Sequence, residues 1–325
     1  MNVNQIVANK IIEKLKDSEA NGTTYYWVKP FAEGSPKRAY SYDTSIAYTG
    51  VNRLLLDADE YLTYNKILEF NKQNNTDYHI RKGAQTNIVV YYNTVILKDD
   101  KGEPIIDELT NKPAERGFLK YYRVFSRQDI VNKDGENLES KFDFKHYTHE
   151  EITEQMRTSL DDFHQMINAY CKNQKIDVEI ISDGTEAYFA PERNLIRFPK
   201  IDNFKSLYEY MHTIAHELIH STMLPLGRKN AEIRDTKTAV KNYSKEELVA
   251  EIGAEMLLQN LCIPDDREYR ENSLAYLQGW SKYLEDKPNE IVSACAKAET
   301  ACNYIFDYLK EIEKTALIDE VELDE

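Results

Sequence analysis

Two histidines one helical turn apart are the residues of this sequence best placed to do chemistry. Residues 216–220 read His-Glu-Leu-Ile-His. In a helix, positions i and i+4 lie on the same face, so His216 and His220 can both bind one ion. Glu217 follows the first histidine and can act as general base toward a water at the ion's open position. The spacing therefore predicts a zinc-dependent hydrolase centre, with Glu217 as its catalytic residue.

A third protein ligand is expected, because catalytic zinc sites usually have three. The best candidates are Glu247 and Glu251, which lie one turn apart in a second predicted helix. One of them can bind the ion while the other holds a ligand histidine through its second ring nitrogen. We favour Glu247 as the metal ligand and Glu251 as the residue that holds a ligand histidine. The alternative is that Glu251 binds the ion and Glu247 holds the histidine. Glu232 and Asp235 lie in a predicted loop and are weaker candidates.

The ligand set favours one zinc ion per chain, although manganese or nickel can occupy the same kind of site. Whether the ion does chemistry is a separate question, because a fold does not guarantee an activity. His212 lies one turn before His216, and we expect it to pack beside the site without binding the ion. Residues 187–189 and 194–198 form a predicted hairpin upstream. Its strands either pair with a peptide substrate or only pack in their sheet.

Apolar patterns predict the helices and strands that must position these residues. Helical spacing of apolar residues predicts helices over 4–16, 63–74, 152–171, 204–223, 244–261, 271–284 and 288–313. Alternating and β-branched runs predict strands over 87–95, 118–125, 178–181, 187–189 and 194–198. The expected fold class is α+β. An N-terminal α+β domain with a small antiparallel sheet covers 1–131, a linker covers 132–150, and a mainly helical metallopeptidase-like domain with a short sheet covers 151–325.

Charge separates the two halves of the chain. The 325 residues carry a formal net charge of −15, but residues 1–127 carry +2 and residues 128–325 carry −17. The acidic second half argues against an anionic partner there, whereas the mildly basic first half is compatible with nucleic acid. No apolar run has the length of a signal peptide or a membrane span, so we expect a cytoplasmic protein with no membrane partner.

Aromatic and basic residues of the first half form a combination that suits single-stranded DNA. In such complexes, bases stack on aromatic rings while basic groups follow the phosphates. The candidates are Tyr25, Tyr26, Trp27, Lys29, Phe31, Arg81, Lys82, Lys120, Tyr121 and Arg123. The simpler interpretation is a set of core aromatics with solvated charges, and the residues alone favour it, because aromatic stripes more often belong to a core.

The two halves together resemble ArdC-type antirestriction proteins of plasmids and phages. The resemblance covers nearly the whole chain and rests on the order and spacing of several segments. In the first half these are WVKPF (27–31), YTGVNRLLL (48–56), IRKG (80–83) and YRVF (122–125). In the second half they are AYF (187–189), HELIHST (216–222), Arg228 and EELVAE (246–251). Ser221 and Tyr61 stand where the family often has tryptophan, and neither is a predicted ligand.

The resemblance implies a single-stranded-DNA-binding domain joined to a zincin-like metallopeptidase domain. It implies His216, His220 and one acidic residue as metal ligands, and it adds Asn52 and Arg53 to the DNA-binding candidates. The expected function is to protect incoming DNA of a mobile element from host restriction, by shielding single strands or by cleaving a host protein such as a restriction component. Two rivals are a metal-binding DNA-protection protein without proteolytic activity, and a metallopeptidase whose first domain recruits a protein partner.

Overall fold

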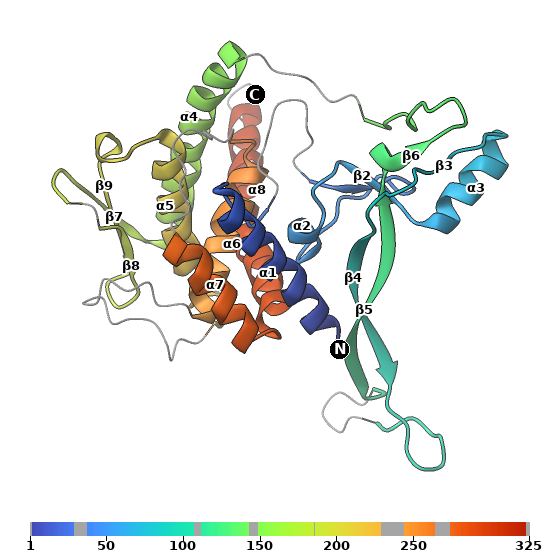
Figure 1. Cartoon of the computed structure of the whole chain (residues 1–325). Coiled ribbons are helices and arrows are strands. Elements are labelled where there is room, and N and C mark those ends of the chain that lie inside the picture. The colour runs from blue at the N-terminus through green and yellow to red at the C-terminus, as the bar shows by residue number, and fades with distance from the viewer. Residues whose placement is uncertain are drawn as a thin grey trace.

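The structure is a computed structural model that describes residues 2–28, 38–106, 112–142, 149–184, 186–228, 244–263 and 274–322. Helices occupy the middle of the molecule, with strands of the first half on one side and a smaller sheet of the second half on the other (Figure 1). The predicted α+β class is confirmed. Within the described ranges, no helix has a stretch that is long and apolar enough to cross a membrane.

The first half contributes one long helix and most of the strands. Asn2 caps the long helix by accepting a hydrogen bond from the backbone of Gln5, and Gly22 ends it with a left-handed φ of 60°. Thr63 caps a later helix, because its side chain accepts a hydrogen bond from the backbone of Lys66. The elements are α1 (Val3–Asn21), β1 (Tyr40–Ser41), α2 (Asn52–Leu55), β2 (Glu60–Leu62), α3 (Tyr64–Asn74), β3 (His79–Ile80), β4 (Asn87–Ile96), β5 (Glu115–Ser126), η1 (Arg127–Asp129) and β6 (Ile130–Val131).

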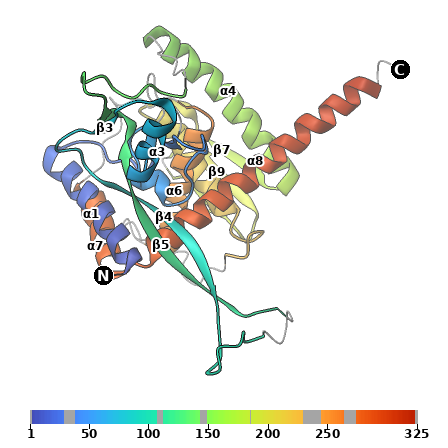
Figure 2. The ribbon, with the colours of Figure 1, turned by 90° about the vertical axis from the view of Figure 1, so that its right-hand side faces the viewer.

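The strands of the first half form two sheets. The larger has the order β1-β2-β5-β4, and β3 pairs with β6 in the smaller. β4 and β5 make a long antiparallel hairpin that extends away from the helices in both views (Figures 1 and 2). Ile88, Val89, Val90 and Val124 are buried at its base, whereas most side chains of its outer part are exposed. The hairpin is therefore anchored in the core at one end and solvated on both faces at the other.

The second half is mainly helical, as predicted. Its sheet has the order β7-β9-β8, with β7 parallel and β8 antiparallel to β9, so β8 is an edge strand. The predicted hairpin consists of β8 and β9. The elements are α4 (His149–Gln174), β7 (Asp177–Ile181), β8 (Tyr188–Ala190), β9 (Leu195–Pro199), η2 (Ile201–Asn203), α5 (Leu207–Ser221), α6 (Lys245–Asn260), α7 (Leu274–Asp286) and α8 (Glu290–Glu322).

One hydrophobic core runs through both halves of the chain. α1 packs against α7 and α8, and its predicted apolar stripe buries Val7, Ile11 and Leu15. Trp27 is 1 % exposed and meets Trp280 of α7 edge-to-face, with 5.5 Å between the ring centroids. The first helix and the segment after it therefore belong to the helical part of the molecule, across the predicted boundary between the domains.

Candidate metal centre

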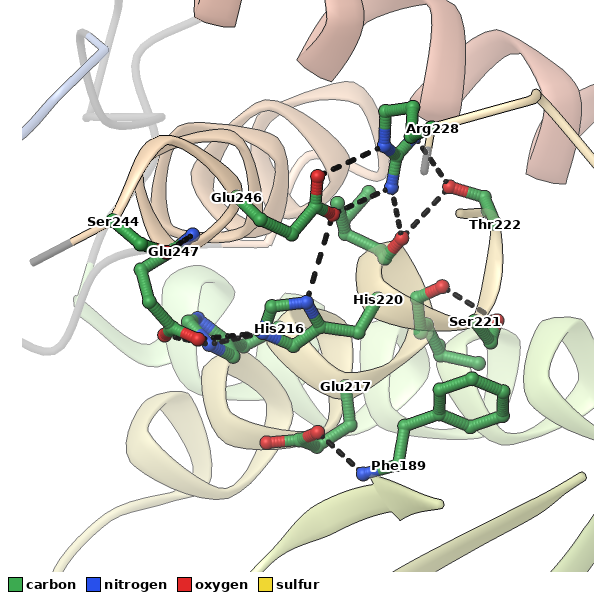
Figure 3. A network of polar contacts seen from close by, with 12 residues as sticks. Phe189, His216, Glu217, His220, Ser221, Thr222, Arg228, Ser244, Glu246 and Glu247 are labelled. Carbon is green, nitrogen blue, oxygen red and sulfur yellow. Dashed lines mark hydrogen bonds and ion pairs between the residues drawn. The ribbon is translucent and has the colours of Figure 1, made fainter. Parts of the chain in front are cut away.

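α5 carries both predicted histidine ligands. It begins after Ser206, whose side chain accepts a hydrogen bond from the backbone of Glu209. His216 and His220 lie one turn apart on the same side of the helix, with their Nε2 atoms 3.1 Å apart. α5 packs along α6, and the two imidazoles lie where the two helices meet (Figure 3).

Glu247 joins the two histidines from the first turn of α6. This helix begins after Ser244, whose side chain accepts a hydrogen bond from the backbone N–H of Glu247. Oε2 of Glu247 lies 3.3 Å from Nε2 of His216, and Oε1 lies 3.5 Å from Nε2 of His220. In the part of the chain that the structure describes, these three residues are the group whose side-chain atoms could together hold a metal ion.

The spacing of the three ligand groups fits a tetrahedral metal ion. Zinc binds nitrogen and carboxylate oxygen at roughly 2.0–2.2 Å, so neighbouring ligand atoms of a tetrahedron are about 3.4 Å apart. The two histidine nitrogens are 3.1 Å apart, His216 lies 3.3 Å from one oxygen of Glu247, and His220 lies 3.5 Å from the other oxygen. Three protein ligands leave a fourth position open, which is the arrangement of catalytic zinc sites. The residues present therefore fit the ion that the sequence predicts.

Electrostatics favour a cation between these groups. Burial lowers the pKa of His220, but the neighbouring carboxylates of Glu246 and Glu247 outweigh burial and raise this pKa to about 10. Burial raises the pKa of Glu247, but His216 and His220 outweigh it and hold that pKa well below its usual range. The carboxylates thus attract positive charge to the histidines. A bound metal ion would take the place of the histidine protons.

Glu217 lies beside the ligand group and is held by the neighbouring sheet. Its side chain is buried, and its Oε2 accepts a hydrogen bond of 2.6 Å from the backbone N–H of Phe189 in β8 (Figure 3). The predicted strand upstream of the motif therefore contacts the predicted general base. A carboxylate fixed in this way can take a proton from a water at the open metal position.

Glu246 lies beside His220 on the side of the ring away from Glu247. Oε1 of Glu246 lies 3.6 Å from Nδ1 of His220, the ring nitrogen on the side away from Glu247. Arg228 binds the same carboxylate at 2.9 and 3.2 Å and also donates to the C-terminal end of α5. Glu251 is buried one turn beyond Glu247. The adjacent pair of α6 thus places one carboxylate at each nitrogen of His220, and Glu251 as the residue behind a ligand histidine stays a prediction.

The other residues considered near the motif are His212, Glu232 and Asp235. His212 stacks on Tyr208 at 6.1 Å between ring centroids, and its Nε2 lies 3.9 Å from a carboxylate oxygen of Glu255. It packs behind the ligand group, as expected. Glu232 and Asp235 lie outside the described residues.

Three predicted DNA contacts lie in the interior of the protein. Trp27 donates its ring N–H to the hydroxyl of Tyr276 at 2.9 Å. Asn52 bonds both backbone groups of Val90 in β4, at 2.7 and 2.8 Å. Arg53 is 3 % exposed and interacts with side chains of α6 and α8. These side chains join elements of the core to one another, which corrects the view of them as surface contacts.

Other predicted DNA contacts lie on the surface. The exposed residues are Arg81, Lys82, Lys120 and Arg123. Strand register places Lys120 and Arg123 on opposite faces of the β4–β5 hairpin, because an odd number of positions separates them. Lys29 lies outside the described residues. The structure therefore does not bring all of the predicted basic residues to one surface.

The fold and the ligand group define a class of protein, one in which a zincin-like domain follows a separate N-terminal region. Residues 165–297 match the family of zincin-like metallopeptidases called MPTase-PolyVal. Residues 1–125 match the N-terminal domain of the anti-restriction factor ArdC. The chain belongs to the ArdC-type antirestriction proteins, as the resemblance in its sequence implies.

Two solved structures share this fold over nearly their whole length. The metal-free antirestriction ArdC protein of the R388 plasmid has a TM-score of 0.61 and 24 % identity, with coverage of 96 % of this chain and 99 % of that chain. The Mn(II)-bound structure of the same protein has a TM-score of 0.57 and 25 % identity, with coverage of 95 % and 98 %.

Three curated proteins are also similar to this chain, and two of them are much longer than it. A DNA primase TraC of Escherichia coli is 26 % identical over 316 residues, which are 94 % of this chain and 20 % of the primase. A second TraC of that species is 25 % identical, over 93 % of this chain and 27 % of its own length. An uncharacterised protein of Sinorhizobium fredii, y4eC, is 24 % identical over 70 % of this chain. The chain thus spans only about a fifth to a quarter of the primases.

Proposed function

We propose that this protein defends DNA of a mobile element against host restriction, using a zinc-dependent peptidase centre together with binding of single-stranded DNA. The observation that carries the proposal is the meeting of His216, His220 and Glu247 at separations that fit a tetrahedral ion. Membership of the ArdC-type family supports the antirestriction role. The Mn(II)-bound relative supports a divalent metal, and the ligand types favour zinc.

The site divides the work of peptide hydrolysis among its residues. Zinc, when held by the three ligands, would polarise the peptide carbonyl and make a bound water more acidic. Glu217 takes the proton of the attacking water and passes it to the nitrogen of the leaving amine. The edge strand β8, whose Phe189 N–H contacts Glu217, offers an extended peptide a strand to pair with. Arg228 and Glu246 keep the imidazole of His220 in position.

Binding of single-stranded DNA is proposed for the first half of the chain. Arg81, Lys82 and Lys120 are exposed there and can meet phosphates. Exposed tyrosines of the hairpin can stack on bases, which need no particular sequence for this contact. Two of the similar proteins are an antirestriction protein and a DNA primase, and both roles concern DNA.

The first test is the metal content of the purified protein beside His216→Ala and Glu247→Ala. We expect roughly one zinc per chain in the wild type and none in either variant, because three protein ligands hold the ion. Zinc that persists in Glu247→Ala but not in His216→Ala would assign the third ligand to another residue, with Glu251 as the first choice. Absence of zinc from the wild type after zinc is added back would contradict the proposed centre.

The second test separates hydrolysis from metal binding. Glu217→Gln keeps the size of the side chain but removes the base, so we expect zinc to stay bound while antirestriction falls to the level of His216→Ala. The measurement is the transformation efficiency of unmodified plasmid DNA into a restricting host that expresses each variant. Full protection by Glu217→Gln with zinc bound would instead support the rival in which the protein shields DNA without proteolysis.

A further inference from the structure

The two faces of the β4–β5 hairpin carry different side chains. Strand register puts Asn87, Val89, Tyr91, Asn93 and Val95 of β4 on one face, opposite Val124, Tyr122, Lys120, Phe118 and Arg116 of β5. We call this the Tyr91 face. The other face carries Tyr121 beside Val90, and we call it the Tyr121 face. Tyr91 and Tyr121 are each 40 % exposed, so the two faces offer matched positions for comparison.

Aromatic rings follow one another along the Tyr91 face toward the body of the protein. The ring centroids of Tyr91 and Tyr122 are 5.9 Å apart. Tyr122 is followed by Tyr48, whose pKa it helps to raise and whose ring centroid is 6.4 Å from that of Tyr61. Further out, the ammonium of Lys120 lies over the ring of Phe118, 5.1 Å from its centroid. Rings and a cation thus share one face.

This line of rings ends at a cavity of about 420 Å³ near the base of the hairpin. Its lining includes Tyr61 and Asn87, the basic residues Arg81 and Lys82, and the acidic residues Asp57 and Asp129. Gly83 has a φ of +88°, which lets the chain turn sharply after the two basic residues. Asp57 is neutralised by Lys14 at 2.8 Å. Among the described residues, neither Arg81 nor Lys82 has a carboxylate partner.

Charge around this surface is opposite in sign to that of the whole protein. Residues 79–98 contain Arg81, Lys82 and Lys98 and no acidic residue, although the chain as a whole carries −15. On the Tyr91 face, β5 carries Arg116 and Lys120 and no acidic residue, because Glu115 and Arg123 lie on the Tyr121 face. A local basic surface on an acidic protein attracts a polyanion at this place.

We propose that single-stranded DNA runs along the Tyr91 face, with a phosphate in the cavity beside Arg81 and Lys82 and with bases stacked on Tyr122 and Tyr91. Lys120 and Arg116 follow the phosphates further along the hairpin. Stacking on rings and pairing of phosphates with basic groups are the two interactions that hold single strands. The Tyr121 face takes no part. This inference rests on the proposed DNA-binding function and assigns it to one surface.

The test compares matched variants of the full-length, zinc-loaded protein in binding to a fluorescent thymidine oligonucleotide by anisotropy. Tyr91→Ala and Tyr122→Ala should each raise the Kd roughly five-fold or more, because each removes a stacking ring. Tyr121→Ala should leave the Kd unchanged, and Tyr91→Phe should retain binding because it keeps the ring. Arg81→Ala with Lys82→Ala should weaken binding and reduce its dependence on salt.

The outcomes distinguish failure of the location from failure of the function. A wild-type protein that does not bind the oligonucleotide at low salt would contradict the proposed DNA binding itself. If the wild type binds the oligonucleotide but Tyr91→Ala and Tyr121→Ala have equal affinities, the proposed DNA binding stands. The assignment of the DNA to the Tyr91 face would then be overturned. Retained binding in Tyr91→Phe shows that the ring carries the effect. Preferential binding of an RNA oligonucleotide of the same length would overturn DNA as the occupant.

Discussion

At the scale of single residues, the centre depends on how the two nitrogens of His220 are used. Nε2 faces Glu247 and the other ligand, while Nδ1 faces Glu246, which Arg228 holds in turn. A carboxylate on the second ring nitrogen fixes the orientation and tautomer of a ligand histidine and makes it a better ligand. Arg228, Glu246 and His220 thus form a series of charged contacts that ends at the proposed metal position.

Replacement of Glu246 by glutamine should weaken these charged contacts, because the new side chain has the same size but no charge. We expect zinc affinity to fall roughly 10- to 100-fold, because the neutral amide no longer supports His220. Competition with a chelating dye measures the affinity. Glu251→Gln is the matched control on the same helix, with a smaller expected effect. A larger loss in Glu251→Gln would return the supporting role to the residue that the sequence analysis favoured.

At the scale of elements, the distance between α5 and α6 decides whether the three ligands meet. Gly253 lies on α6, where an added Cβ would sit 2.9–3.0 Å from side-chain carbons of Ile219 on α5. These contacts are shorter than packed carbon atoms allow, so glycine is what lets the two helices approach. The helix that carries Glu247 is therefore positioned by a residue that takes no part in metal binding.

Substitution Gly253→Ala tests this close approach. Overpacking of a core typically costs about 1–3 kcal/mol, partly offset by the better helix propensity of alanine. We expect a lower free energy of unfolding by urea and a weaker zinc affinity, because α6 must move away from α5. Adding Ile219→Ala removes the clashing carbons, so the double variant should lose less than the sum of the single variants. Additive losses would show that the two positions do not interact.

At the scale of the whole molecule, the N-terminal segment helps to build the metal-binding half. α1 packs on α7 and α8, and the backbone N–H of Trp27 donates to Glu255 of α6 at 3.1 Å. Glu255 also lies near His212 on α5. The hairpin, in contrast, projects away from these helices (Figure 2). Core contacts and the proposed DNA surface of the first half are therefore separate regions of the molecule.

The variant Trp27→Ala tests whether the core contacts of the first half are separate from its proposed DNA surface. We expect the loss of a fully buried tryptophan to reduce the free energy of unfolding by roughly 3–5 kcal/mol. The affinity for the thymidine oligonucleotide should not change at a temperature where the variant is folded, because the ring is not on the surface. Urea unfolding and anisotropy measure the two quantities. A weaker affinity at unchanged stability would instead identify Trp27 as a DNA contact.

The sequence by itself determined the parts of this protein that depend on local periodicity. Helical spacing places His216 and His220 on one face whatever surrounds them, and Glu217 next to them. Apolar patterns were enough to predict the long helices and strands, because these signals act over a few residues. The faces of Lys120 and Arg123 also follow from the two-residue period of a strand.

Only the tertiary structure decided the choices that depend on packing between distant segments. Glu246, Glu247 and Glu251 are all carboxylates near the start of one helix, and the rotation of α6 against α5 brings Glu247 to the metal position and Glu246 to His220. Similarly, an aromatic or basic residue has the same local pattern whether it is buried or exposed. Trp27 meets α7 and Arg53 meets α6 and α8, contacts between residues more than 200 positions apart that no local pattern encodes.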